Sequence, residues 1–187
     1  METKLYIAKL KSISPLGQSA PIRTPRGSQE GYDEYENRVW KERLHVDKNG
    51  MVFIPPMAFF YSICEAAARE GMKVPGRRGA TYKKLFESGI LIHEPIVTNV
   101  KADDVALERL FVPSDGKRGG GTRVWKNFPR IDEWKAEAKI YVINQLISAE
   151  VLAKHIETSG MLVGLGFFRP QTLGFWGRFQ CEELKLV

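Results

Sequence analysis

Basic side chains gather in two stretches of this chain that contain almost no acid, and such stretches can bind phosphates. Residues 116–130 read GKRGGGTRVWKNFPR, with five basic residues and no acidic one. Residues 69–84 carry six basic residues against Glu70 alone. A smaller basic pair, Arg23 and Arg26, lies in a stretch rich in proline, glycine and serine. Cations without local neutralisation attract polyanions, so these stretches are candidate nucleic-acid contacts; the alternative for each is a solvated loop.

Aromatic residues stand among these cations and add the second chemistry that single-strand binding needs. Trp125 lies between Arg123 and Lys126, and Trp40 also has basic neighbours. A base stacked on such a ring contributes roughly 1–3 kcal/mol without sequence preference. Trp125 is a stronger stacking candidate than Trp176, because the residues around Trp125 are less typical of a core.

Glycines and arginines alternate near the C-terminus in a pattern that favours close approach to another chain. Glycine lacks a Cβ, so its backbone can lie against a partner, while arginine can hold phosphates or main-chain carbonyls. The alternative is a glycine-bent hairpin with solvated arginines. A dinucleotide site is disfavoured, because a helix precedes the segment and a strand follows it, the reverse of the required order. The pattern consists of Gly164, Gly166, Arg169, Gly174, Gly177 and Arg178.

Residues that commonly catalyse reactions or bind metals are scattered. His45, His93 and His155 stand alone, and no spacing of His or Cys typical of a metal site occurs. No nucleophile-elbow motif occurs either. Asp115, beside the glycine run, is the residue that we would test for strand cleavage. We therefore expect no enzymatic activity, no cofactor and no metal.

Length and composition predict one folded domain. The chain has 187 residues, 43% of them hydrophobic, and a net charge of +6. No apolar run approaches the ~18 residues that cross a bilayer, and the N-terminus lacks an apolar signal core. Cys64 and Cys181 lie among apolar residues, as reduced cysteines do; the alternative is a single structural disulfide. We expect a cytoplasmic protein without membrane association.

Periodic patterns predict the elements that position the candidate groups. Helical spacing and capping residues predict helices from Pro55-Pro56 to Gly71, over 81–87, and from Ser148 to Gly160. Alternation and apolar runs predict strands over 3–11, 38–47, 51–54, 90–98 and 134–144, with a final strand at the C-terminus. Residues 14–37 read as a flexible loop, and about 99–134 as an inserted thumb hairpin. The order predicts an α+β fold: a modified ferredoxin-like (RNA-recognition-motif-like) βαββαβ core in a single domain, 1–187.

Two motifs resemble those of the RAMP superfamily, the repeat-associated proteins of CRISPR effector complexes. One is the Gly-x-Gly…Arg…Gly-x-x-Gly-Arg-Phe pattern near the C-terminus. The other is VFIPPMAFFYSICEA at 52–66, a strand, then Ile-Pro, then a helix. Pro56 and Met57 replace the family's usual glycine and serine. The pattern is most similar to the backbone subunits, which polymerise along a nucleic-acid strand, and also to phage-encoded proteins suspected to coat single-stranded DNA.

The resemblance implies a protein that binds single-stranded nucleic acid, DNA foremost, and oligomerises along the strand largely without sequence preference. Partners would then be the strand, further copies, and CRISPR-effector or phage replication and recombination proteins, in the cytoplasm of a prokaryotic or phage-infected cell. The alternatives are a protein-interaction subunit or decoy of a CRISPR effector complex, or a metal-independent ribonuclease. In this resemblance the glycine and arginine pattern lines the strand-facing groove, and Lys117, Arg118 and Arg123 lie on the thumb. The full set of candidate contacts is Arg23, Arg26, Trp40, Arg43, Arg77, Arg78, Lys83, Lys84, Lys117, Arg118, Arg123, Trp125, Lys126, Gly164, Gly166, Arg169, Gly174, Gly177 and Arg178.

Overall fold

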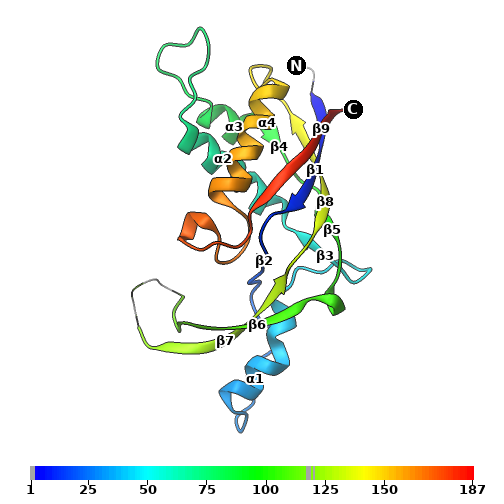
Figure 1. The fold of residues 1–187 in the computed structure, drawn as a ribbon, viewed down its shortest axis with the longest axis vertical. Helices are drawn as coiled ribbons and strands as arrows, with labels where there is room; N and C mark the ends of the chain where they lie inside the picture. Colours follow the sequence, from blue (N-terminus) through cyan, green and yellow to red (C-terminus); the bar gives the residue numbers. More distant parts are fainter. Residues whose placement is uncertain (1–2, 117–118, 120) are drawn as a thin grey trace.

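A large antiparallel sheet with helices against one face forms the body of the molecule (Figure 1). The computed structural model describes residues 3–116, 119 and 121–187. The strand order in this sheet is β3-β5-β8-β1-β9, and the short β4 pairs with β8. The strands are β1 (Lys4–Ser12), β3 (Met51–Ile54), β4 (Ile90–Leu91), β5 (Ile96–Lys101), β8 (Lys135–Val142) and β9 (Phe179–Leu186).

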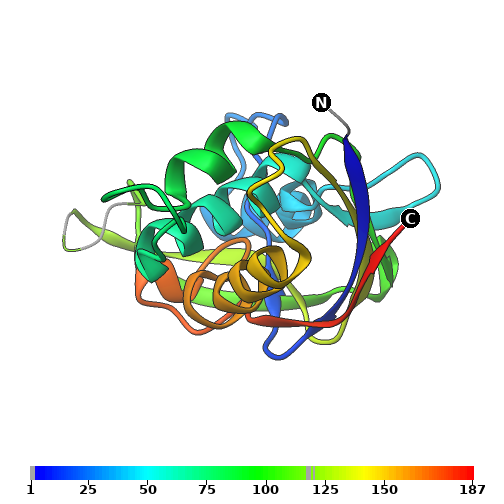
Figure 2. The same cartoon turned by 90° about the horizontal axis from the view of Figure 1, so that it is seen from above.

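The helices α2 (Pro56–Glu70), α3 (Lys83–Gly89) and α4 (Ala149–Thr158) lie on the same face of this sheet (Figure 2). α2 starts at a proline, which needs no N–H partner in the first turn, and ends at Gly71 in the left-handed conformation. α4 starts at Ser148, whose hydroxyl accepts a hydrogen bond from the Val151 amide. Within the described ranges, no helix is long and apolar enough to cross a membrane.

The predicted βαββαβ core is confirmed. Along the chain β1, α2, β5, β8, α4 and β9 follow one another, and in space β5, β8, β1 and β9 lie side by side. This is the ferredoxin-like arrangement, with β3 added at one edge. Pro95 separates β4 from β5, as expected for a proline that cannot donate to a central ladder.

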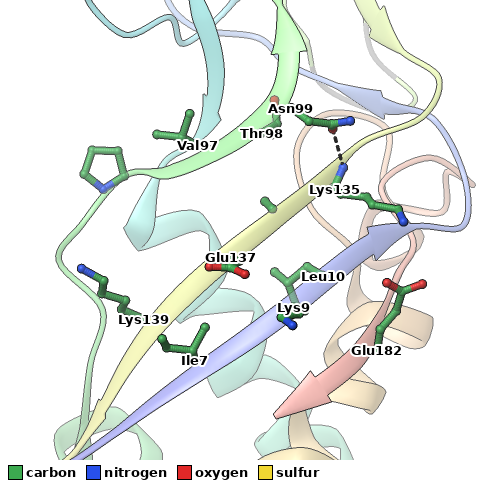
Figure 3. A pocket seen from close by; sticks show the side chains of 12 residues that line it. Ile7, Lys9, Leu10, Val97, Thr98, Asn99, Lys135, Glu137, Lys139 and Glu182 are labelled. Carbon is green, nitrogen blue, oxygen red and sulfur yellow. Dashed lines mark hydrogen bonds between the residues drawn. The ribbon is translucent and has the colours of Figure 1, made fainter. Parts of the chain in front are cut away.

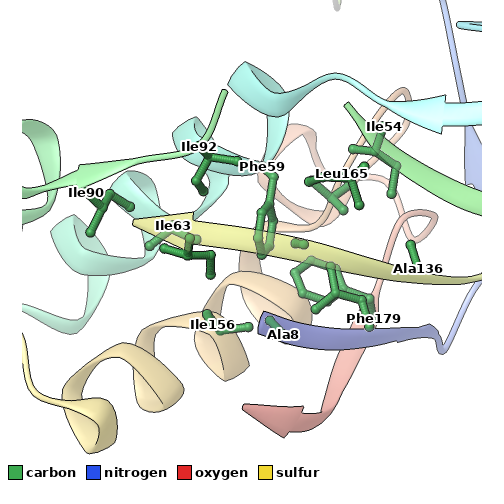
Figure 4. Close-up of a cluster of buried hydrophobic side chains, with 14 of the residues drawn as sticks. Ala8, Ile54, Phe59, Ile63, Ile90, Ile92, Ala136, Ile156, Leu165 and Phe179 are labelled. Atoms are coloured by element: carbon green, nitrogen blue, oxygen red, sulfur yellow. The ribbon is translucent and has the colours of Figure 1, made fainter. Parts of the chain in front are cut away.

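Small residues in the middle of the sheet make room for large rings between the sheet and the helices (Figure 4). Ala8 of β1 lies opposite Ala138 of β8, and both are fully buried. Phe59 of α2 and Phe179 of β9 fill this space, edge to face, with their ring centroids 5.8 Å apart. Burying each such ring stabilises the fold by roughly 1.5–3 kcal/mol.

A second, smaller sheet carries a long hairpin. β6 (Ala106–Pro113) and β7 (Arg123–Ile131) pair with each other, and the root of β7 pairs with β2 (Leu16–Gly17). Helix α1 (Tyr32–Val39) and the 3-10 turn η1 (Trp40–Arg43) pack against β7, and η2 (Ala102–Asp104) precedes β6. These strands fall inside the segment 99–134 that was expected to leave the core.

Three predicted elements differ from the structure. The strand over 38–47 is wrong, because residues 32–43 form α1 and η1. For the same reason the segment 14–37 is not a loop throughout: it holds β2 and most of α1. The helix α4 does not end at Gly160; a π-helical turn, η3 (Ser159–Val163), follows it. A Cβ on Gly160 would lie 2.0 Å from the Phe179 carbonyl oxygen, so this glycine admits β9 rather than ending a helix.

A buried histidine makes folding sensitive to pH. His155 of α4 is fully buried, and its Nδ1 donates to the Val151 carbonyl at 2.6 Å. Burial lowers its pKa, because it removes the hydration of the imidazolium; the Val151 carbonyl and Glu70 oppose this shift, and Lys154 adds to it. In the unfolded chain this imidazole takes up a proton near pH 6.5, whereas in the folded chain it does so only at a lower pH. The free energy of unfolding is therefore highest above about pH 6.5 and falls as the pH drops below it.

We expect the free energy of unfolding to fall between about pH 7 and pH 5, and His155→Leu to reduce this fall. Urea unfolding at several pH values measures it. His93→Asn, which removes an exposed imidazole, is the control and should keep the parent's pH dependence. An equal fall in His155→Leu and the parent would place the sensitivity elsewhere.

Candidate nucleic-acid interface

Three segments project on the side of the molecule that carries the helices (Figures 1 and 2). They are the basic loop between α2 and α3 (71–82), the glycine loop (164–178), and the hairpin formed by β6 and β7. All three contain residues that the sequence identified as candidate contacts. The structure thus brings distant parts of the chain to one side.

One face of the hairpin presents two aromatic rings between two arginines. Phe111 and Trp125 are directly opposed across the strands, with ring centroids 5.1 Å apart, and each ring is about half exposed (46% and 49%). The Arg109 guanidinium lies 5.4 Å from the Trp125 ring, and that of Arg123 lies 5.4 Å from the Phe111 ring. We call these four residues the ladder.

Neighbouring contacts fix the arginines of the ladder in place. Arg123 donates to the Phe111 carbonyl oxygen at 2.7 Å. Arg109 pairs with Asp33 of α1 at 2.9 Å. Both contacts hold the guanidinium groups beside the rings, so the ladder is an ordered surface of guanidinium groups and aromatic faces in which Asp33 offsets the charge of Arg109.

The hairpin has two unlike faces, because side chains alternate along a strand. Lys126 and Phe128 point away from the ladder. Phe128 is buried and stacks on Phe167 of the glycine loop, with centroids 4.2 Å apart and planes 10° from parallel. Lys126 is half-buried and donates to the Ser114 carbonyl oxygen. Trp125 and Arg123 therefore lie on a different face of the hairpin from the contact with the glycine loop.

The glycines of the glycine loop let the chain pack against itself. A Cβ on Gly166 would lie 2.1 Å from the Gly17 carbonyl oxygen, and one on Gly174 would lie 1.9 Å from that of Phe168. A Cβ on Gly177 would lie 1.9 Å from the Leu165 oxygen, and one on Gly164 would lie 2.6 Å from a proline carbon. The close approach that these glycines were expected to offer to another chain is used here within the chain.

The two arginines of the glycine loop bind main-chain carbonyls. Arg169 donates to the Gly166 oxygen and to the Gln171 side chain. Arg178 donates to the oxygens of Met161 and Phe175 at 3.1 and 3.2 Å. This is one of the two roles that the sequence allowed for them.

The basic loop carries its cations in solvent. Arg77 and Arg78 are exposed, as are Lys83 and Lys84 in the first turn of α3. Lys83 approaches Glu87 at 4.0 Å, whereas Arg77 and Arg78 have no acidic partner among the described residues. The charge of Arg77 and Arg78 is thus not neutralised within the described part of the chain.

Arg43 and Trp40 do not suit a nucleic-acid contact, and the sequence interpretation of both is corrected. Arg43 is 9% exposed; its guanidinium donates to both Glu36 carboxylate oxygens at 3.0 Å and to the Asn127 carbonyl. Trp40 is half-buried and packs against the core. Both residues join α1 and η1 to the rest of the fold.

The remaining candidates are dispersed. Arg23 and Arg26 are exposed in the loop before α1, where Glu42 accepts hydrogen bonds from the backbone of residues 23 and 24. Lys117 and Arg118 lie outside the described residues. The candidate contacts therefore form separate groups rather than one continuous patch.

The open face of the large sheet contains a hollow of about 640 Å³, but its charges are balanced (Figure 3). Lys9 pairs with Glu183 at 2.6 Å, and Lys139 pairs with Glu94 at 2.9 Å. The side chains lining it come from β1, β5, β8, β9 and the turn before β5, and none of them is aromatic. This hollow is lined by three lysines, two of them ion-paired, and by two glutamates, with no ring among its lining residues, so it offers little to a polyanion or to bases.

No cluster of three or more His, Cys, Asp or Glu residues that could hold a metal ion occurs in the described parts of the chain. Arg109 and Phe111 are not among the candidate contacts that the sequence predicted. Their signal lies in cross-strand pairing: residues 109 and 111 alternate like 123 and 125, and the register places the two pairs side by side.

Comparisons with known proteins support the fold. No protein-family model matches the chain, and no curated protein matches it. A chain of the cryo-EM structure of type III-B Cmr-beta bound to cognate target RNA matches with a TM-score of 0.51 and 7% identity, over 100% of this chain and 61% of that one. This chain thus spans about three fifths (61%) of that neighbour's length. The crystal structure of Cmr6 from Pyrococcus furiosus matches with a TM-score of 0.51 and 11% identity, over 97% of this chain and 99% of that one. The likeness confirms the predicted fold class, an α+β fold with a ferredoxin-like core.

Proposed function

We propose that this chain binds a single strand of nucleic acid on the side where the three segments project, largely without sequence preference. The ladder carries the proposal. An exposed Phe–Trp pair held between two arginines offers stacking surfaces for bases and positive charge for phosphates in one place. The free cations of the basic loop add charge on the same side.

Within this proposal we place single-stranded DNA first and expect copies to assemble side by side along it. The sequence resemblance to polymerising backbone subunits supports the assembly. Rings and guanidinium groups bind base faces and phosphates, which DNA and RNA share. The test therefore measures binding to single-stranded DNA and to single-stranded RNA in parallel.

A second candidate function is that of a subunit in a CRISPR effector complex. The likeness to Cmr6, and to a chain of a Cmr complex bound to target RNA, favours it. In that case the chain would contact its strand as one member of a larger assembly. Pull-down with purified effector subunits after nuclease treatment distinguishes it, because protein contacts then persist without the strand.

We expect tight binding to single strands of about 30 nucleotides, weaker binding to duplex, and a strong dependence on salt. If a protomer neutralises about four phosphates, log K should fall with a slope near −3 against log salt. Fluorescence anisotropy at several salt concentrations measures this slope. Absence of binding to single-stranded DNA and RNA at low salt would contradict the proposal.

Matched variants separate local contacts from net charge. Arg77→Ala with Arg78→Ala removes two positive charges from the basic loop; Lys9→Ala with Lys139→Ala removes two from the open sheet face. Only the first pair should flatten the salt slope.

Trp125→Ala should weaken binding about fivefold or more, the equivalent of one lost stack of about 1 kcal/mol. Leu91→Ala, which shortens a similarly exposed side chain (45%), should leave binding unchanged.

A further inference from the structure

The tip of the glycine loop exposes two large apolar side chains that the fold does not use. Leu173 is 72% exposed and Phe175 is 61% exposed. Leu173 also has a positive φ of 62°, a backbone conformation that residues other than glycine rarely adopt. A leucine with a strained backbone beside an exposed ring is an unusual combination. The backbone conformation costs free energy, and the exposed side chains contribute no burial to the core.

Hydrogen bonds hold this tip rigid. The 3-10 turn η4 (Pro170–Thr172) is closed by the Leu173 amide, which donates to the Pro170 carbonyl at 2.9 Å. The Gly174 amide donates to the Arg169 carbonyl, and the Trp176 amide to that of Phe168. The backbone that carries Leu173 and Phe175 is therefore held by hydrogen bonds on both sides.

A chain of ring contacts connects the tip to the root of the hairpin. Phe175 packs edge-on against Phe168, with centroids 4.9 Å apart and planes at 69°. Phe168 in turn contacts Phe167, which stacks on Phe128 of β7. Because one edge-on contact anchors the Phe175 ring while most of its surface stays in solvent, the ring can receive a second flat group.

Unused donors flank the tip. A guanidinium has five N–H donors. Arg169 and Arg178 each donate two hydrogen bonds within the described residues, which fix the two groups beneath the tip. The remaining donors can bind an anion. The tip thus combines exposed apolar side chains with two positively charged arginines. This combination suits a ligand that has flat apolar faces on an anionic backbone.

We infer that Leu173 and Phe175 form an apolar wedge that inserts between two neighbouring bases of the bound strand, while Arg169 and Arg178 bind the adjacent phosphates. Inserted apolar side chains of this kind are known to separate stacked bases. The inference rests on the proposed function and adds to it a second stacking site, on the glycine loop rather than on the ladder.

The test compares two strands of equal charge: oligo-thymidine of about 12 nucleotides and a strand of the same length built from abasic sugar phosphates. The parent should prefer the strand with bases. Leu173→Asn with Phe175→Ser should lower this preference about fivefold or more, the loss of one stack of about 1 kcal/mol, and leave the affinity for the abasic strand and the salt slope unchanged. Asparagine is used because it tolerates a positive φ. Leu186→Ser, at a similarly exposed position (54%) on β9, is the matched control and should keep the parent's preference.

The outcomes separate the two proposals. A parent that binds neither strand contradicts the proposed function and the wedge together. A double variant with the parent's preference contradicts the wedge alone. Sedimentation of the same samples gives a further check: a double variant that keeps the strand preference but loses self-association would assign the tip to a protein interface and overturn the wedge.

Discussion

The Arg43→Met variant should lose about 3–5 kcal/mol of folding free energy, because it leaves a carboxylate buried without its cation. Glu36 and Arg43 are both nearly inaccessible, at 3% and 9%. Glu36 also accepts a hydrogen bond from the Asn127 amide of β7. The pair thus joins α1, η1 and the root of the hairpin, and urea unfolding of the variant measures its role.

Two comparisons make this prediction specific. Arg38→Met breaks the bidentate pair with Glu30 at the surface of α1, where water replaces the lost partner, and should cost much less. Glu36→Leu combined with Arg43→Met should be less destabilising than Arg43→Met alone, since no charge is then stranded. A single variant as stable as the parent would show that water reaches Glu36 and that the junction is open.

The same pair explains why α1 was not predicted from the sequence. Within α1 the buried residues are Glu36 and Val39, so the inward face of the helix carries a charge where an apolar residue is expected. The helix is polar on average, and Glu36 interrupts the face formed by its few apolar residues, Tyr32, Tyr35 and Val39. The alternation of residues over 38–47 therefore predicted a strand with Arg43 on its exposed side. In the structure Arg43 is buried, because its charge is paired with that of Glu36.

The core was predictable because its local signals agree with its packing. Pro55-Pro56 and Gly71 mark the ends of α2, and Ser148 marks the start of α4, as the structure shows. These residues act through the backbone of their own segment, so the sequence alone reveals them. The ferredoxin-like order then follows from the sequence of strands and helices.

The arrangement of the candidate site depends on contacts that the sequence does not encode locally. Trp125 could be singled out by its basic neighbours, but its pairing with Phe111 requires the register between β6 and β7. The glycines near the C-terminus indicated a close backbone approach without indicating that the partner is residue 17 of the same chain. Contacts between residues about 150 positions apart become visible only once the sheets have formed.

The Gly166→Ala variant should lose about 2–5 kcal/mol of stability, because two separate penalties meet at this position. Gly166 has a φ of 71°, a conformation that strains any residue with a Cβ. Its Cβ would also lie 2.1 Å from the Gly17 carbonyl oxygen and 2.8 Å from a Leu16 methyl carbon. The Gly17 oxygen accepts the Phe167 amide at 2.8 Å, so relief of the clash would pull apart the bridge between β2 and the glycine loop.

Gly50→Ala isolates the first penalty, the cost of the positive φ. Gly50 has a similar φ of 78°, but a Cβ there meets nothing within 4 Å, so only the conformational cost of about 1–2 kcal/mol applies. Thermal and urea unfolding of both variants should therefore show the larger loss at Gly166. Equal losses would mean that β2 can move aside without cost. β2 also pairs with β7 at the root of the hairpin. If Gly166→Ala destabilises the fold more than Gly50→Ala does, it should therefore also weaken binding of single-stranded nucleic acid by the hairpin. This would connect the packing of the glycine loop to the proposed function.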